Sequence, residues 1–167
     1  DPTILAAVPH ADLAWVIDPI DGTKNFVRGS VDHGVMLAQL NRGETVRGWI
    51  WQPQHGHMWF AERGTGVTCD GDEVTRGVSH SPVRAATTHE AYKIASPVVE
   101  WRMAKWCCAV DYPLVCLGEN DVTVYQHSYP WDHLPGALMV REVGGVVRTV
   151  DGVEYGPQET SGKLVAA

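Results

Sequence analysis

A short apolar run that ends in Asp-Pro-Ile-Asp constrains the fold of this chain more than any other feature. The run, residues 13–17, predicts a buried strand, and Asp18 and Asp21 follow it directly. Proline fixes its own backbone and moves the preceding residue away from the helical region, so that the carbonyl of Ile20 can point between the two carboxylates. Carboxylate and carbonyl oxygens are ligands that suit Mg²⁺, which also binds phosphate oxygens. The end of this strand therefore predicts a magnesium site.

Gly22 and Thr23 follow the second carboxylate and add groups that can bind a phosphate. Glycine lets the backbone approach a ligand closely, and threonine supplies a hydroxyl and an amide. The alternative is a strand followed by a solvated acidic turn. We favour the binding site because a second acidic motif lies further along the chain.

The second motif is Trp-Asp at residues 131–132, at the start of a predicted helix. Pro135 is tolerated in a first turn, apolar residues follow at helical spacing, and Gly144 and Gly145 end the helix. Taken alone, Asp132 fits the common role of a carboxylate that caps a helix N-terminus. Together with the first motif it becomes a candidate metal ligand.

The two motifs together resemble the inositol monophosphatase family of Mg²⁺-dependent, lithium-sensitive phosphatases. Asp-Pro-Ile-Asp-Gly-Thr followed by Asn25 and Phe26 is one match, and Trp-Asp with a downstream Glu-x-x-Gly-Gly is the other, in the right order. The resemblance runs from about Trp15 to Val150. It implies an α/β fold in one domain over residues 1–167, a layered αβαβα sandwich of the sugar-phosphatase type with mostly antiparallel sheets. It also implies a homodimer.

The resemblance further implies a role for each matching residue, in a reaction in which metal-activated water hydrolyses a small phosphate monoester. Asp21 and Thr23 are then catalytic, with Thr23 orienting the water together with a glutamate that the family carries upstream of the strand. The implied Mg²⁺ ligands are Asp18, Asp21, Asp132 and the carbonyl of Ile20, and the implied phosphate-binding amides are those of Gly22 and Thr23.

The chain departs from the family pattern at its N-terminal side. It begins at Asp1 and contains no Glu-containing metal motif before Asp18. We therefore expect that the N-terminal region of the family is missing, that the C-terminus is also truncated, and that further segments are absent within residues 78–101. A chain that lacks the upstream glutamate is expected to be nearly inactive, because groups that orient or deprotonate water contribute roughly 10²–10⁴-fold.

Two further departures concern the substrate. Tyr125 stands where inositol phosphatases place a substrate-binding glutamate, and residues 106–108, Trp-Cys-Cys, replace the Gly-Ser or Gly-Thr segment of the family pocket. An inositol phosphate, histidinol phosphate, a sugar phosphate and a nucleotide 3′-phosphate all remain open as substrates. The rival of another class is a non-catalytic protein that keeps the phosphatase fold and acts through protein contacts.

Composition excludes some partners. The net charge of −7 over 167 residues argues against a nucleic-acid or anionic-membrane surface. No apolar run is long enough to span a membrane, and the four cysteines lack the spacing of a zinc ribbon or a redox dithiol. We expect a cytoplasmic protein with reduced thiols.

Several histidines and tryptophans suggest roles that we set aside. His55 and His57 share one face of a predicted strand, but without a third ligand nearby in the sequence we expect surface or packing residues rather than a zinc site. His133 is expected either to orient Asp132 or to face solvent. The tryptophans at 49, 51 and 59 are interpreted as sheet packing.

The remaining pattern predicts an antiparallel meander followed by mixed elements. Residues 63–88 are expected to form turns and loops, and residues 101–112 a helix that ends before Pro113. The further predicted strands are residues 34–40, 46–51, 57–61 and 121–126, with a final strand at 146–150.

Overall fold

The computed structural model describes residues 2–167, and its first sheet contains six strands in sequence order. A helix, α1 (Pro2–Ala7), and a 3₁₀ helix, η1 (Val8–His10), precede the sheet, and α2 (Thr23–Val27) follows its first strand. Each strand pairs antiparallel with the next, which confirms the predicted meander. The strands are β1 (Leu13–Asp21), β2 (Gly34–Asn41), β3 (Glu44–Gln52), β4 (His57–Glu62), β5 (Gly66–Cys69) and β6 (Asp72–Glu73).

The second sheet contains five strands in the order β10-β11-β9-β7-β8. β7 lies parallel to both β8 and β9, whereas β11 pairs antiparallel with β9 and β10. The elements of this half are β7 (Val83–Thr87), the 3₁₀ helix η2 (Glu90–Tyr92), β8 (Val99–Met103), β9 (Val122–Tyr125), β10 (Val147–Thr149) and β11 (Leu164–Ala166).

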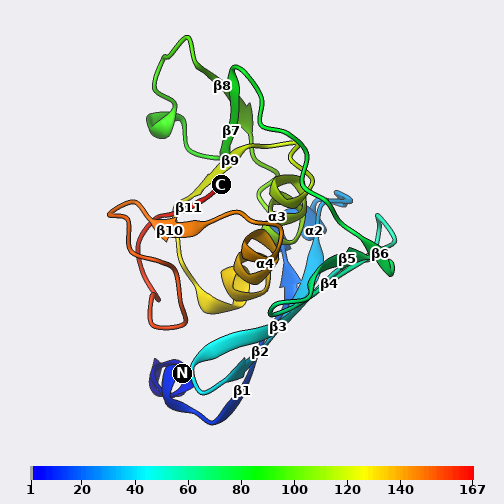
Figure 1. Cartoon of the computed structure of the whole chain (residues 1–167), viewed down its shortest axis with the longest axis vertical. Helices are drawn as coiled ribbons and strands as arrows, with labels where there is room; N and C mark the ends of the chain where they lie inside the picture. Colours follow the sequence, from blue (N-terminus) through cyan, green and yellow to red (C-terminus); the bar gives the residue numbers. More distant parts are fainter. Residues whose placement is uncertain (1) are drawn as a thin grey trace.

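Two helices, α3 (Cys108–Cys116) and α4 (Pro130–Glu142), lie between the sheets (Figure 1). Both are buried over most of their length, and α4 buries every residue from His133 to Val140. The architecture is therefore sheet, helix pair, sheet, which confirms the expected α/β class with mostly antiparallel sheets. The core lies along α4, with Met36, Leu40 and Ile50 of the first sheet fully buried against it. Among residues 2–167, no helix has the length and apolar character that crossing a membrane requires.

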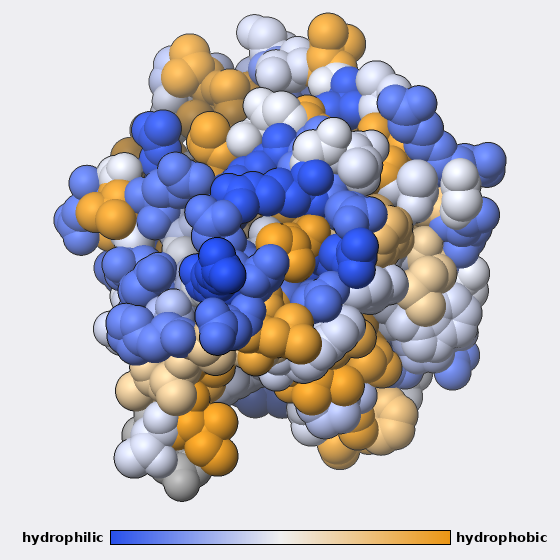
Figure 2. All heavy atoms as spheres, turned by 60° about the horizontal axis from the view of Figure 1, so that its bottom comes forward, coloured by the Kyte–Doolittle hydropathy of each residue, from blue (hydrophilic) through white to orange (hydrophobic). Residues whose placement is uncertain are grey.

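β1 is less buried than its apolar sequence predicts. Leu13, Trp15 and Ile17 are all more than half exposed, whereas Val16 between them is buried. Exposure alternates along the strand because α4 covers one face of the sheet and no other described residues form a layer on the opposite face. On that outer face the ring of Trp15 stacks on Trp49 with centroids 5.9 Å apart. Figure 2 brings this lower side of the molecule forward and shows hydrophobic residues at the surface.

The predicted bounds of the helix over residues 101–112 are both wrong. Residues 99–103 form β8, and α3 begins at Cys108 and continues through Pro113 to Cys116. Proline has no N–H for the carbonyl four residues earlier, which here is that of Ala109. The side chain of Gln52, buried in β3, donates to that carbonyl at 2.7 Å and replaces the missing bond. This long-range contact allows the proline inside the helix.

The other element predictions hold in part. The strands expected at 34–40, 46–51, 57–61 and 121–126 are present within a few residues of their predicted bounds, and the helix that carries Asp132 starts two residues earlier, at Pro130. Residues 63–88 are not all loop, since they contain β5, β6 and β7. The strand near residue 147 is not the last one, because β11 follows it. The missing segments expected within 78–101 remain a prediction.

Candidate metal and phosphate site

The end of β1 bulges between its two carboxylates. Asp18 pairs with Met36 and Asp21 with Gly34, so the regular register is lost across the intervening Pro-Ile pair. The backbone N–H of Ile20 donates to Asp18 Oδ1 at 2.9 Å, as expected of a tight turn that begins with an aspartate. The bulge presents both carboxylates at one edge of the sheet.

Asp132 reaches the same point from the first turn of α4. One oxygen from each of Asp18, Asp21 and Asp132 lies within 4.8 Å of the others. More than a hundred residues separate the first motif from the second along the chain, and the structure brings them together as the sequence predicts. Three carboxylates offer hard oxygen donors of the kind that Mg²⁺ prefers, so the residues present fit a divalent metal.

The electrostatics of this cluster favour a cation. Burial, together with the charges of Asp21 and Asp18, raises the pKa of Asp132 to about 8. Burial also raises the pKa of Asp21 above its ordinary value, although hydrogen bonds from Ala109 and Cys107 act in the opposite direction. Like charges so close together repel one another, and a bound cation relieves that repulsion.

Asp21 is held from the second half of the chain. Its Oδ2 accepts the backbone N–H of Ala109 at 2.6 Å and the thiol of Cys107 at 3.0 Å. Burial holds the pKa of the Cys107 thiol far above its usual range, so the sulfur keeps its proton and acts as the donor. The N-terminus of α3 therefore fixes the orientation of a carboxylate at the end of β1.

The turn after Asp21 is compact. Gly22 adopts the left-handed conformation, with φ of 74°, and a Cβ there would lie 3.0 Å from the carbonyl oxygen of Asp32. The hydroxyl of Thr23 donates to the carbonyl of Ile20 at 2.8 Å. The structure thus keeps the expected ligand carbonyl, the expected phosphate amides and the expected water-orienting hydroxyl within one turn.

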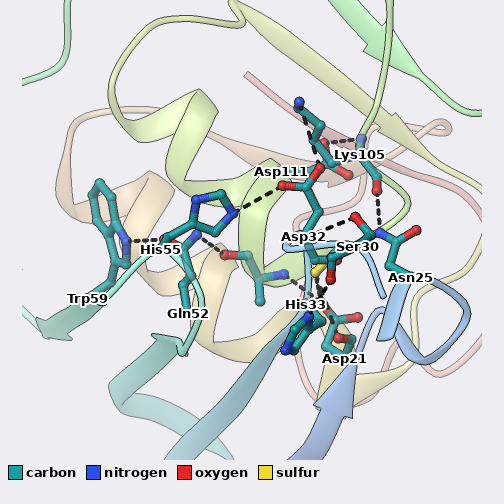
Figure 3. A network of polar contacts seen from close by, with 12 residues as sticks. Asp21, Asn25, Ser30, Asp32, His33, Gln52, His55, Trp59, Lys105 and Asp111 are labelled. Atoms are coloured by element: carbon teal, nitrogen blue, oxygen red, sulfur yellow. Dashed lines mark hydrogen bonds and ion pairs between the residues drawn. The ribbon is translucent and has the colours of Figure 1, made fainter. Parts of the chain in front are cut away.

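A polar network lies next to this turn (Figure 3). The side chain of Asn25 donates to the carbonyls of Asp32 and Lys105, at 2.7 and 2.8 Å. His55 pairs with Asp32 at 3.1 Å, and the N–H of Lys105 donates to buried Asp111 at 2.8 Å. Burial raises the pKa of Asp111 to about 7. This network joins α2 to the loop before α3, and no sequence motif indicates it because its members are far apart in the chain.

The three carboxylates line a pocket of about 470 Å³. Its wall includes an aromatic stack in which Tyr129 lies between two rings: His127, with centroids 5.3 Å apart, and Trp131, at 5.0 Å and with an interplanar angle of only 6°. Trp106 lines the same pocket and is more than half exposed. Alternating aromatic residues at 127, 129 and 131 are a pattern that could have indicated this wall from the sequence.

Tyr125 lines the pocket but is buried, with its ring stacked on that of Tyr112 at 5.1 Å. Its hydroxyl has no hydrogen-bond partner among the described residues. A buried hydroxyl without a partner is costly.

His133 has neither of the two roles expected of it. It is buried, its Nδ1 lies 2.9 Å from the hydroxyl of Tyr112, and no hydrogen bond to Asp132 is formed. Burial lowers the pKa of His133 to about 3, so the ring is neutral. The side chain packs in the core because this part of α4 is buried, and its ring contacts those of Tyr112 and Tyr155 edge-on.

The fold and the cluster of carboxylates at a pocket wall define a class of α/β proteins with a candidate divalent-metal site, and sequence comparison gives the family. Residues 3–167 match the model of the inositol monophosphatase family. The chain belongs to this family.

Individual relatives of known name share about 30% of their aligned residues with this chain. The fructose-1,6-bisphosphatase/inositol-1-monophosphatase of Thermotoga maritima is 30% identical over 151 residues, which are 86% of this chain and 59% of that protein. The Nus factor SuhB of Escherichia coli is 29% identical over 156 residues, 84% of this chain and 58% of that protein. The chain spans about three fifths of the length of these curated relatives.

A solved structure supports the fold. The crystal structure of an IMPase/NADP phosphatase complexed with Mg²⁺ and phosphate aligns with a TM-score of 0.81 at 20% identity, over 93% of this chain and 62% of that chain. At this identity the likeness shows the fold alone.

Proposed function

We propose that the protein containing this chain hydrolyses a small phosphate monoester with the help of Mg²⁺. The observation that carries the proposal is the convergence of Asp18, Asp21 and Asp132 within 4.8 Å at the wall of a pocket. Membership of a phosphatase family and a relative with Mg²⁺ and phosphate bound support it. The metal supplies charge neutralisation for the phosphate and lowers the pKa of bound water.

The chain's own residues bind the metal and the phosphate and orient the attacking water. Asp18, Asp21 and Asp132 hold the metal, with the carbonyl of Ile20 as a further donor. The hydroxyl of Thr23 donates to that carbonyl, so its oxygen lone pairs can accept a hydrogen bond from the attacking water and orient it. The amides after Asp21 hold the phosphate oxygens. Water attacks the phosphorus directly, and no covalent enzyme intermediate forms.

The aromatic wall favours a substrate whose leaving group carries a planar ring. Polyols such as inositol are held by hydrogen bonds to charged and polar groups, and Tyr125 replaces the acid at that position. Base–aromatic stacking contributes about 1–3 kcal/mol per base. Of the alternatives, histidinol phosphate and a nucleotide 3′-phosphate therefore rank above inositol and sugar phosphates. The ratio of kcat/KM values across such a panel measures this preference.

One observation supports the alternative of a non-catalytic protein with the phosphatase fold. A relative at 29% identity is named as a Nus factor rather than as an enzyme. A protein of this type would keep the fold and act through protein contacts. The cytoplasmic location and the homodimer remain proposals of the same kind, based on family membership.

The substitution Asp18→Asn tests the proposal, with Asp12→Asn as a matched control. Asp18 belongs to the cluster, whereas the side chain of Asp12 is 97% exposed and faces Arg42 across 3.7 Å. We expect Asp18→Asn to lose at least about 10²-fold in kcat, since one charged ligand is removed, and Asp12→Asn to retain full activity. Phosphate release is measured with Mg²⁺ and with EDTA, on the protein with any residues that precede Asp1 in its gene. Activity that survives EDTA or Asp18→Asn would refute a metal mechanism.

A further inference from the structure

A second group of metal-ligating side chains lies on the outer strands of the first sheet. His57 starts β4, Cys69 ends β5, and Asp70 is the next residue in the turn to β6. One ligand atom from each of the three lies within 4.8 Å of the others. None of them lines the pocket of the carboxylate cluster. Figure 1 shows β4, β5 and β6 at the side of the molecule.

Strand pairing explains why these residues meet. Trp59 pairs with Cys69, so His57, two residues before Trp59, lies on the same face of the sheet as the thiol. Asp70 has a positive φ of 54°, which turns the chain back so that its backbone N–H donates to the carbonyl of Met58. The sequence offers no third ligand near His57 because the other two come from the end of the neighbouring strand and from the turn after it.

Side-chain contacts already assemble the group. Asp70 Oδ2 lies 2.8 Å from His57 Nδ1 and accepts a long bond from the Cys69 thiol at 3.7 Å. The N–H of Met58 donates to the other oxygen, Asp70 Oδ1, at 2.8 Å and fixes the carboxylate. The carboxylate is therefore oriented by the backbone, and both neighbouring ligands converge on its free side.

The chemistry of the donors selects a class of metal. An imidazole, a thiol and a carboxylate are a mixed nitrogen, sulfur and oxygen set, which suits Zn²⁺ and its analogue Co²⁺ but not Mg²⁺. The side chains of His57 and Asp70 are about half exposed, so a water can take the fourth position. Burial, together with the negative charges of Asp70 and Asp72, raises the pKa of the Cys69 thiol to about 11, so the thiol must lose its proton when a metal binds.

We propose that His57, Cys69 and Asp70 form a binding site for a thiophilic divalent metal of the Zn²⁺ class, separate from the carboxylate cluster. Binding replaces the thiol proton, which is released to solvent, and no electron is transferred. The metal joins β4 to the end of β5 and so stabilises the outer strands of the sheet. The site is independent of the proposed phosphatase activity.

Cobalt binding to the metal-free chain tests the proposal, because a cobalt–thiolate bond gives a charge-transfer absorption that oxygen ligands do not give. The matched histidine pair is His57→Gln and His55→Gln, since His55 contacts Asp32 instead of the group. The matched thiol pair is Cys69→Ser and Cys108→Ser. Circular dichroism shows that each variant is folded, and competition with Zn²⁺ gives the relative affinity.

We expect one equivalent of Co²⁺ with thiolate absorption in the parent chain, displaced by Zn²⁺. Cys69→Ser should abolish the band, and His57→Gln should weaken cobalt binding at least tenfold, whereas His55→Gln and Cys108→Ser should leave both unchanged. Absence of the band in the parent chain, or its persistence in Cys69→Ser, would overturn the proposal. If Cys69→Ser fails to fold, Zn²⁺ protection of Cys69 against alkylation in the parent chain decides the same question, and no protection rejects the site.

Discussion

The Oδ2 atom of Asp21 accepts the backbone N–H of Ala109 at 2.6 Å, across 88 residues of sequence. Asp21 ends β1 and Ala109 lies in the first turn of α3, so this one bond connects the first sheet to the central helices. The bond also leaves the carboxylate with a fixed orientation toward Asp18 and Asp132. The geometry of the proposed metal ligands therefore depends on the packing of the helices against the sheet.

The raised pKa of Asp132 predicts how stability depends on pH. Its folded pKa of about 8 lies above the ordinary value of 3.8, so ionisation destabilises the folded, metal-free protein. The penalty is absent below pH 3.8, grows as the pH rises, and is complete above about pH 8. We expect Asp132→Asn to raise the melting temperature in EDTA at pH 8 and to have little effect at pH 4.

The measurement is thermal unfolding of both proteins at the two pH values, with EDTA and with excess Mg²⁺. Mg²⁺ should stabilise the parent more at pH 8 than at pH 5, because binding at the lower pH must first remove a proton. An equal effect of Asp132→Asn at both pH values would contradict the raised pKa.

Gly22 and Gly29 form a matched pair for the phosphate turn. Both have positive φ, 74° and 72°, so alanine costs about 1–2 kcal/mol at either position. Only Gly22 is also crowded, since a Cβ there would lie 3.0 Å from the Asp32 carbonyl and 3.1 Å from Cys107. We expect Gly29→Ala to retain activity with a modest loss of stability, and Gly22→Ala to lose both. Chemical denaturation and phosphate release measure the two effects, and equal behaviour of the variants would refute a special role for the turn.

Local motifs predict the convergence of the three carboxylates better than periodicity predicts the elements. Asp18, Asp21 and Asp132 are recognised because each sits in a short motif whose chemistry depends on adjacent residues. The helix bound near Pro113 was predicted wrongly because it depends on Gln52, a residue of β3 that donates to the Ala109 carbonyl. No pattern within residues 101–116 contains that information.

Burial was harder to predict than strand position. β1 was placed correctly, yet Trp15 is 53% exposed, because exposure depends on which layer covers the outer face of the sheet. Similarly, the residues that lie beside His57 cannot be found from spacing, since Cys69 and Asp70 reach it through the pairing of β4 with β5. Contacts between strands are set by register, which the sequence of one strand does not contain.

Gly136 should be intolerant of alanine although it lies inside a helix. By helix propensity alone, glycine to alanine in a helix interior stabilises by about 1 kcal/mol. A Cβ at Gly136 would lie 2.1 Å from the ring of Tyr112, where α4 packs on α3. Overpacking of this kind costs about 1–3 kcal/mol or more, so we expect net destabilisation. A rise in melting temperature for Gly136→Ala would show that the two helices can move apart without cost.

A comparison of Tyr125→Phe with Tyr112→Phe distinguishes an effect on ligand binding from an effect on stability. The Tyr112 hydroxyl lies 2.9 Å from His133 Nδ1, whereas the buried Tyr125 hydroxyl has no partner among the described residues. Tyr112→Phe removes a hydrogen bond and should destabilise the fold by about 1 kcal/mol. Tyr125→Phe removes an unsatisfied polar group, so the free energy of unfolding should stay the same or rise.

Enzyme kinetics give the second half of this prediction. If the Tyr125 hydroxyl contacts the substrate, Tyr125→Phe raises KM by about tenfold, which corresponds to the loss of one hydrogen bond of about 1.4 kcal/mol, and leaves kcat nearly unchanged. Tyr112→Phe should leave KM unchanged, because its hydroxyl faces His133 in the core. An unchanged KM in Tyr125→Phe, measured with the best substrate of the phosphate panel, would remove Tyr125 from the substrate site and leave it as a core residue that stacks on Tyr112.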